Sequence, residues 1–336
     1  MSIEINGETK KIGLALSGGG FRAAAFHLGV FRKLEQMGLL WNLDLLTCVS
    51  GGSIAGAFLA ANWKQADALD RLENYLRTKS IAVSSFLSGI LDPSSTRLEK
   101  LAESYDRHLF SGAMLDALKN GPRIYLNSTN LSTGNMFFFV AGANLDTEMG
   151  EWELGVQDAR NFPICRAVAA SSAFPPVFPP LYVGQDTYAN NMVDYVTLTD
   201  GGVYDNLGVN PLLRTRNELD YAIVSDAGKP FAMEGEPTEL GSMVLKESIS
   251  ILMEQVRGLQ FSRLQLSHES DSGPKPIWFS IDSTEGQVQY GDAEFASAIS
   301  TNLKKLNDAE IGVLTRHAGG LLHSRITRYA PELNQV

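Results

Sequence analysis

Twice within its first sixty residues, the chain shows a short apolar run that ends in glycines and leads into a helix-forming segment. Residues 12–16, IGLAL, precede three glycines at 18–20, and residues 21–38 then repeat apolar side chains with helical spacing. Residues 45–50, LLTCVS, precede Gly-Gly-Ser at 51–53, and small helix-compatible residues follow. A strand, a glycine turn and a helix, repeated in this order, predict an α/β fold built on parallel strands.

The rest of the chain continues to alternate between strand and helix patterns. Further strand patterns lie in RIYLNSTNL, NMFFFVAG, YVTLTD, DYAIVSD and PIWFSI, and a long amphipathic helix is expected at 243–266. This alternation predicts a three-layer α/β architecture, in which a mostly parallel central sheet carries helices on both faces. The ligand sites of such sheets lie at the carboxyl ends of the strands.

We expect a single domain over residues 1–336. Its core is predicted at about 10–230, a helical insertion at about 66–120, and a C-terminal extension of helices and a strand at about 240–336. Within the insertion, residues 81–91 are apolar but interrupted by serines and a glycine. This pattern fits either a cover that touches a membrane surface or a buried pair of helices.

Composition and charge narrow the function classes. A formal net charge of -10 argues against nucleic-acid binding, which needs a basic face. Cys48 and Cys165 lie in apolar surroundings without the spacing of a metal or redox site, so we expect both to be core residues in a reducing compartment. No cofactor is expected. The polar N-terminus lacks a secretory pattern, and no apolar stretch approaches the roughly 20 residues that span a bilayer. A cytoplasmic protein, at most peripheral at a membrane, is expected, with its oligomeric state left open.

The second glycine turn offers a candidate nucleophile. A reactive serine at a sharp strand-to-helix turn needs small neighbours, because the backbone bends tightly there. Gly51 and Gly52 precede Ser53, and this arrangement is close to the G-x-S-x-G pattern. Ala55 stands where the last glycine of that pattern would be, and Gly56 follows one place later. Ser53 is therefore the predicted nucleophile, although an ordinary strand-to-helix turn is the competing interpretation.

The first glycine turn provides what an acyl-transfer site would need beside a nucleophile. Negative charge develops on the carbonyl oxygen in acyl transfer, and backbone N–H groups at a helix start can stabilise it. Gly18, Gly19 and Gly20 are the predicted oxyanion loop, with Gly19 and Gly20 as the donors. Arg22 completes this segment, and it is expected either to anchor the loop or to lie near an anionic lipid head group.

The same turn also fits a dinucleotide-binding fingerprint. Gly18, Gly20 and Ala23 match G-x-G-x-x-G/A after a strand. That fingerprint requires an acidic residue at the end of the next strand, where this chain has Ser-Gly-Gly-Ser at 50–53. Asp44 precedes that strand instead of following it. The dinucleotide interpretation therefore fails at its most specific element.

An aspartate is the best candidate for the base. Asp200 ends the strand pattern YVTLTD, and Gly201 and Gly202 then turn the chain, so its carboxylate could accept the proton of Ser53 directly. Asp205, with Asn206, is expected either to cap the next helix or to order this base loop. The histidines are interpreted as packing or surface residues, with the first of them kept as an alternative base: His27, His108, His268, His317 and His323.

Together these segments resemble the patatin-like phospholipase family. SGGGFRA, GGSIAG and TDGGVYDNLG are similar, in order and spacing, to its oxyanion loop, nucleophile elbow and catalytic Asp-Gly-Gly. The first motif also resembles that of cytosolic phospholipase A catalytic domains. The similarity includes STNLSTG and ASSAFPPVFPP and covers roughly residues 10–230. Three residues depart from the family pattern, namely Ser17, Ala23 and Ala55.

The resemblance implies a patatin-like three-layer fold and a lipid acyl hydrolase of the phospholipase A type. It implies a Ser-Asp dyad of Ser53 and Asp200, an acyl-enzyme intermediate, no metal, and a phospholipid or another ester lipid as substrate. Transient contact with a membrane surface is compatible with this interpretation. The alternative is a regulated effector or binding protein with the same fold, whose hydrolase is switched by a partner or signal.

Overall fold

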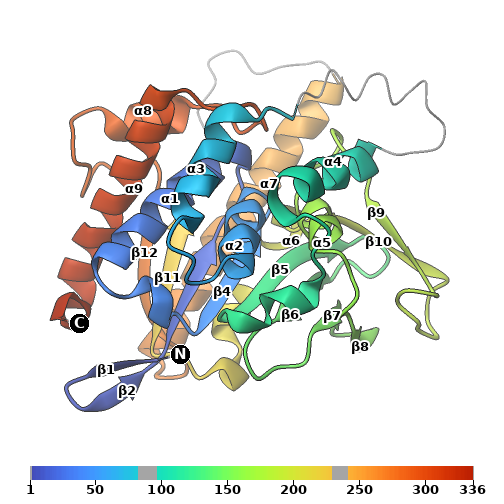
Figure 1. Cartoon of the computed structure of the whole chain (residues 1–336), viewed down its shortest axis with the longest axis horizontal. Helices are drawn as coiled ribbons and strands as arrows, with labels where there is room; N and C mark the ends of the chain where they lie inside the picture. The colour runs from blue at the N-terminus through green and yellow to red at the C-terminus, as the bar shows by residue number, and fades with distance from the viewer. Residues whose placement is uncertain (1, 82–96, 229–240, 336) are drawn as a thin grey trace.

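The computed structural model describes residues 2–81, 97–228 and 241–335. Over these residues, one ten-stranded sheet forms the centre of the molecule and a two-stranded hairpin projects from it (Figure 1). The hairpin consists of β1 (Ile3–Ile5) and β2 (Glu8–Lys10). The sheet contains β3 (Ile12–Leu16), β4 (Leu45–Val49), β5 (Arg123–Asn130), β6 (Met136–Ala141), β7 (Glu148–Glu151), β8 (Gly155–Asp158), β9 (Leu181–Gly184), β10 (Tyr195–Asp200), β11 (Tyr221–Asp226) and β12 (Lys275–Ser280).

The sheet is parallel in one half and antiparallel in the other. Its order is β12-β11-β3-β4-β5-β6-β7-β8, and β12 through β5 are parallel neighbours. β6, β7 and β8 continue it in antiparallel fashion, and β10 pairs antiparallel with both β5 and β9. The predicted α/β class is confirmed, with a mixed sheet in which the strands that carry the glycine turns are parallel.

Helices cover both faces of this sheet. The described helices are α1 (Gly20–Gln36), α2 (Gly51–Ala61), α3 (Ala68–Thr78), α4 (Arg97–Tyr105), α5 (Ile164–Ser171), α6 (Gly202–Asp205), α7 (Gly241–Glu269), α8 (Asp292–Ala298) and α9 (Asp308–Tyr329). Short helical turns lie at η1 (Leu40–Asn42), η3 (Asp106–Phe110), η4 (Leu115–Asn120), η5 (Asn210–Leu213), η6 (Thr215–Asn217) and η7 (Pro331–Gln335). In Figure 1, α1, α2 and α3 lie in front of the sheet and α7 lies behind it.

Alternation along the strands produces two hydrophobic cores. Successive side chains of a strand point to opposite faces, so Leu14 and Leu16 of β3 join the large core under α1, α2 and α9. Ala15, between them, belongs to a smaller core on the other face. That second core includes Leu264 of α7 and Leu212 of η5. The glycine turns therefore end strands that are covered on both sides.

The C-terminal hundred residues belong to the same core. β12 adds a parallel strand next to β11, and Ile277 and Phe279 are fully buried in the large core. α9 begins with a capping box, in which Asn307 and Glu310 exchange side-chain and backbone hydrogen bonds. Its buried Leu314 and Leu321 then join the same core as α1. Of the apolar segment at 81–91, expected to be either a membrane-facing cover or a buried pair of helices, all but Ile81 lies outside the described residues.

A buried ion pair fastens α7 to the end of β11. Arg257 Nε lies 2.6 Å from Asp226 Oδ2, and its Nη2 donates to Ser280 Oγ at 3.1 Å. The Asp226 side chain is fully buried. Burial raises the pKa of Asp226, whereas the Arg257 charge acts in the opposite direction. The pair therefore neutralises a carboxylate that has no access to water.

We expect Arg257→Met to lower the free energy of unfolding by about 3–5 kcal/mol, because it leaves the Asp226 carboxylate buried without a counter-ion. Urea unfolding at pH 8 measures the difference. The double variant Asp226→Asn/Arg257→Met is the control, and it should recover most of the loss because neither charge remains. Equal losses in the single and double variants would contradict this account.

Candidate active site

The turn between β4 and α2 is sharper and earlier than the sequence pattern suggests. The strand was expected to run through Ser50, but β4 ends at Val49 and α2 begins at Gly51. Ser50 is the single residue between them, with φ 52° and ψ -116°. A non-glycine residue in such a conformation costs about 1–3 kcal/mol and persists only where the surrounding structure enforces it. The strained residue of this turn is therefore a serine.

The expected turn residues Gly51 and Gly52 instead form the first turn of α2. The physical reason is a close approach of two backbones: a Cβ on Gly51 would lie 2.2 Å from the Gly20 carbonyl oxygen. A Cβ on Gly52 would lie 2.2 Å from the carbonyl oxygen of Leu16. Only glycine lets the start of α2 pack directly on the end of β3. These two residues are therefore required for the packing of α2 against β3 and the glycine loop.

Ser53 lies inside α2 and is fully buried. Its Oγ lies 2.7 Å from Ser171 Oγ. Ser171 Oγ donates to the carbonyl oxygen of Asn127 at 2.6 Å, so the Ser53 hydroxyl is the donor in its pair with Ser171. Among the residues that the structure describes, no hydrogen bond joins Ser53 to Asp200. The structure does not bring together the two groups predicted to react.

Strand register places Asp200 beside Ser50. Val49 of β4 pairs with Asn127 of β5. Asp200 of β10 pairs with Ser128, the next residue of β5. β6 pairs with the other edge of β5 up to Thr129, so β4 and β10 share one edge. The two strands therefore approach each other end to end from opposite directions. Ser50, which follows Val49, meets the carboxylate at the end of β10.

The Asp200 carboxylate is buried and has few partners. Its side chain accepts a hydrogen bond from the Gly202 N–H at 2.7 Å, and the Ser50 hydroxyl lies close enough to affect its pKa. Burial raises the pKa of Asp200 to about 7, although the Gly202 N–H and the Ser50 hydroxyl act in the opposite direction. Ser50 itself is partly accessible to solvent. A carboxylate with this pKa can accept and return a proton near neutral pH.

The glycine loop after β3 lies against Ser50. A Cβ on Gly18 would be 3.1 Å from the Ser50 Cβ, so this loop passes directly over the turn. Gly18 donates its N–H to the Asn206 carbonyl oxygen at 3.1 Å. Gly20 and Gly51 are the first residues of α1 and α2, where backbone N–H groups have no partner within the helix. Two helix N-termini, with their partial positive charge, therefore converge near one serine.

Arg22 acts as an anchor of this loop. Its guanidinium is fully buried and donates to three backbone carbonyl oxygens, those of Ala227, Ser297 and Ile299, at 2.8–3.1 Å. Burial lowers the pKa of Arg22 to about 10. These contacts fit the first of its two predicted roles, that of an anchor, and join the glycine loop to the residue after β11 and to the C-terminal end of α8.

The base loop is held by its own backbone and side chains. Gly201 donates its N–H to the carbonyl oxygen of Ser171, and Gly202 begins α6. Asp205 is buried, and its carboxylate accepts from the N–H groups of Leu207 and Gly208 at 3.1 Å. The expectation that Asp205 orders this loop agrees with these contacts.

His27, the alternative base, has a structural role. His27 is fully buried between Ser225 Oγ and the Ser17 carbonyl oxygen, each 2.9 Å from a ring nitrogen. Burial lowers the pKa of His27 to about 4.

Among the described residues, no three His, Cys, Asp or Glu side chains gather in a way that could hold a metal ion. Within those same residues, no helix has both the length and the apolar character needed to cross a bilayer.

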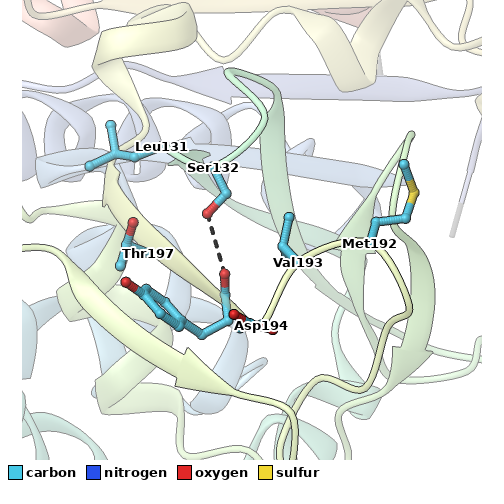
Figure 2. Close-up of a pocket in the computed structure, with 7 residues that line it drawn as sticks. Leu131, Ser132, Met192, Val193, Asp194 and Thr197 are labelled. Atoms are coloured by element: carbon cyan, nitrogen blue, oxygen red, sulfur yellow. Dashed lines mark hydrogen bonds between the residues drawn. The ribbon is translucent and has the colours of Figure 1, made fainter.

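A separate hollow of about 470 Å³ lies at the hairpin of β9 and β10. Figure 2 shows Leu131, Met192 and Thr197 around it, with a hydrogen bond from Ser132 Oγ to the Tyr195 carbonyl oxygen at 3.4 Å. Neither Ser50 nor Asp200 lines this hollow. It therefore does not belong to the site around the strained serine.

A signal for Ser50 was present in the sequence. Cys48, Val49, Ser50, Gly51 and Gly52 also match G-x-S-x-G, with Cys48 as the only departure. This alignment places the last glycine of the pattern where the structure needs it, at Gly52. The choice of Ser53 accepted Ala55 at that place instead. Two overlapping serine patterns, three residues apart, made the choice ambiguous.

A serine at a strained strand-to-helix turn, a glycine loop and a buried carboxylate, all at strand ends, define an α/β protein with a hydrolase-type site. The chain belongs to the patatin-like phospholipase family, whose sequence profile matches residues 14–213. No curated protein matches it by sequence.

Solved structures support the fold. Human GIVD cytosolic phospholipase A2 superposes with a TM-score of 0.62 at 13% identity, over 96% of this chain and 60% of that one. The same human protein in complex with methyl gamma-linolenyl fluorophosphonate inhibitor and terbium chloride gives a TM-score of 0.59 at 14% identity, over 97% and 59%. This chain thus spans about three fifths of the length of those proteins.

Proposed function

We propose that this protein is a lipid acyl hydrolase of the phospholipase A type, with Ser50 as nucleophile and Asp200 as base. The observation that carries the proposal is the strained Ser50 directly after β4, which the strand register places next to the buried carboxylate of Asp200. This assignment replaces Ser53 by Ser50 and keeps Asp200. Membership of the patatin-like phospholipase family supports lipid esters as the substrate class.

The proposed reaction proceeds in two acyl-transfer steps. Ser50 Oγ attacks the ester carbonyl carbon while Asp200 accepts its proton, and the same proton then passes to the departing alcohol. Water next attacks the acyl-serine and gives a proton to Asp200, which passes it to Ser50 Oγ as the acyl–oxygen bond breaks and the fatty acid is released. The N–H groups of Gly19, Gly20 and Gly51 are the proposed donors to the oxyanion. Gly18 is left out, since its N–H is already bonded to Asn206.

Ser53 has a supporting role in this proposal. The Ser171 hydroxyl accepts the Ser50 N–H at 3.0 Å and the Ser53 hydroxyl at 2.7 Å, and donates to Asn127. Ser171 also accepts the Gly201 N–H at its carbonyl oxygen. One residue thus joins the turn that carries Ser50 to the loop that follows Asp200. Ser53 contributes to holding Ser171 in that position.

The raised pKa of Asp200 predicts how activity varies with pH. The carboxylate is the active form, so kcat/KM should rise through pH 7 and level off above it. Below that point the rate should fall about tenfold per pH unit, because one proton blocks the base. Initial rates on a soluble ester between pH 5.5 and 9 measure this profile. A flat profile between pH 6 and 8 would speak against Asp200 as the base.

Covalent labelling with a fluorophosphonate tests the nucleophile. The wild-type protein should gain one phosphonate on Ser50, and Ser50→Ala should gain none at this site. Between Lys33 and Lys64 the sequence has no lysine or arginine, so trypsin leaves Ser50 and Ser53 on one peptide. Fragment ions that break at Gly51 and Gly52 distinguish the two serines. A label on Ser53 in the wild-type protein would overturn the assignment of Ser50.

A further inference from the structure

α7 exposes a row of leucines that no described part of the chain covers. Leu245, Leu252, Leu259 and Leu266 follow one another at intervals of seven residues, which is nearly two helical turns. They are 62%, 64%, 70% and 63% exposed. Side chains spaced in this way form one continuous ridge along a helix. We call these four residues the leucine ridge.

The opposite side of α7 fastens the helix to the protein. Leu264 is buried in the smaller core, and Arg257 forms the ion pair with Asp226. Met253 reaches the base loop, since a Cβ on Gly202 would lie 3.2 Å from its Cε. These contacts fix which face of α7 points outward. The rotation of this docked helix therefore holds the leucine ridge at the surface.

The ridge has the spacing of a coiled-coil seam. Ile249 and Val256 each stand three residues before a ridge leucine and are half-buried beside it. Branched side chains at this position, combined with leucine three residues later, favour two-stranded coiled coils. Arg263 takes the corresponding place before Leu266 and bonds to Asn210, so the seam is apolar over its first two heptads. The pattern fits a partner helix with the same spacing of leucine and branched side chains, such as α7 of a second copy.

We propose that two copies of this chain associate through a two-fold symmetric pairing of their α7 helices along the leucine ridge. A two-fold axis presents the same patch on both subunits, so an uncharged, self-complementary patch suits it. The residues that flank the ridge on its other side are Ser248, Gln255 and Ser262, which introduce no like-charge repulsion between copies. Charge elsewhere on this acidic chain keeps other faces apart.

The exposed area is adequate for such a pairing. The four leucines expose on the order of 500 Å² per chain, and Val244 and Ile251 extend the patch toward the roughly 800 Å² per partner of a standard interface. Large exposed patches of this kind are uncommon on monomers.

A lipid surface is the competing occupant of the leucine ridge. Helices that lie in membranes usually flank their apolar face with lysine and arginine, whereas here serine and glutamine flank one side, and the places on the other side are Ile249, Val256 and Arg263.

Sedimentation equilibrium of the full chain tests the pairing. The wild-type protein should sediment as a dimer at micromolar concentration, and Leu252→Glu/Leu259→Glu should sediment as a monomer with an unchanged circular dichroism spectrum. Val288→Glu/Tyr290→Glu is the matched control, because it places two charges on exposed apolar residues away from α7 and should remain dimeric.

A charge-swap experiment gives a positive test. Leu252→Lys/Leu259→Lys should also be monomeric, and mixing it with the glutamate variant should restore a dimer. A monomeric wild-type protein, or a dimer that survives the glutamate variant, overturns the proposal. Co-sedimentation of a monomeric wild-type protein with phosphatidylcholine vesicles, lost in the glutamate variant, would instead assign the ridge to a lipid surface and also overturn it. None of these readouts depends on hydrolysis.

Discussion

Ser50→Ala should lower kcat/KM for a lipid or p-nitrophenyl ester by about 10⁴-fold or more. The nucleophile is absent in this variant, and only binding and oxyanion stabilisation remain. The fold should be retained, because alanine fits the same space and Ser50 is only partly buried. Initial rates at saturating and subsaturating substrate, with a thermal melt of each protein, provide the measurement.

Ser53→Ala is the matched control, since it removes a hydroxyl from the same short segment. We expect it to lose about tenfold or less, because one hydrogen bond to Ser171 disappears while Ser50 and Asp200 remain. The two serines lie at the start of the same helix. A large difference in activity between the two variants therefore distinguishes the serine that reacts from the serine that only supports the turn. If Ser53→Ala were inactive and Ser50→Ala active, the assignment would be reversed.

Asp200→Asn should abolish turnover to a similar extent, because an amide cannot accept the proton of Ser50. Its oxygen can still accept the hydrogen bond from the Gly202 N–H, so the base loop keeps its shape. Labelling of Ser50 by a fluorophosphonate should become slow in parallel. Asp194→Asn is the control, as Asp194 is an exposed carboxylate near the start of the same strand. A near-normal rate in Asp200→Asn would exclude the proposed dyad.

Asp200→Asn should be more stable than the wild-type protein at pH 8. Because the folded-state pKa of Asp200 is about 7, against about 3.9 in the unfolded chain, the folded protein holds this proton more tightly. Its contribution to stability is full below pH 4 and is lost as pH rises to 7, at a cost of up to about 4 kcal/mol. Asn carries no charge, so the melting temperatures should separate by several degrees at pH 8 and converge toward pH 4. A difference in melting temperature that does not change with pH would argue against the buried Asp200 carboxylate as its cause.

Local patterns in the sequence were sufficient for the strands and helices that position the site. IGLAL became β3, the long amphipathic pattern became α7, and YVTLTD became β10 with Asp200 at its end. Each pattern has a strong period or a clear stop, so tertiary contacts did not need to override it. The mixed character of the sheet was less visible, because pairing direction depends on partners distant in sequence.

The choice between the two serines shows where local information ends. Both C-V-S-G-G and G-G-S-I-A read as acceptable elbow patterns, and a difference of one residue in the end of β4 decides between them. The deciding contacts are the close approach of Gly51 to Gly20 and the bond from Ser50 N–H to Ser171. Gly20 is 31 positions before Gly51 and Ser171 is 121 positions after Ser50. No local pattern contains them.

By itself, the sequence determined the α/β class and the family resemblance, and it pointed to the glycine loop and to Asp200, because each depends on residue types at short spacing. Only the tertiary structure decided that the strained serine is Ser50 and that Asp200 meets it. The physical reason is that β4 and β10 end at consecutive residues on one edge of β5, and this register is a property of the assembled sheet. The outward face of α7 was decided in the same way, by the ion pair and core contacts that fix its rotation.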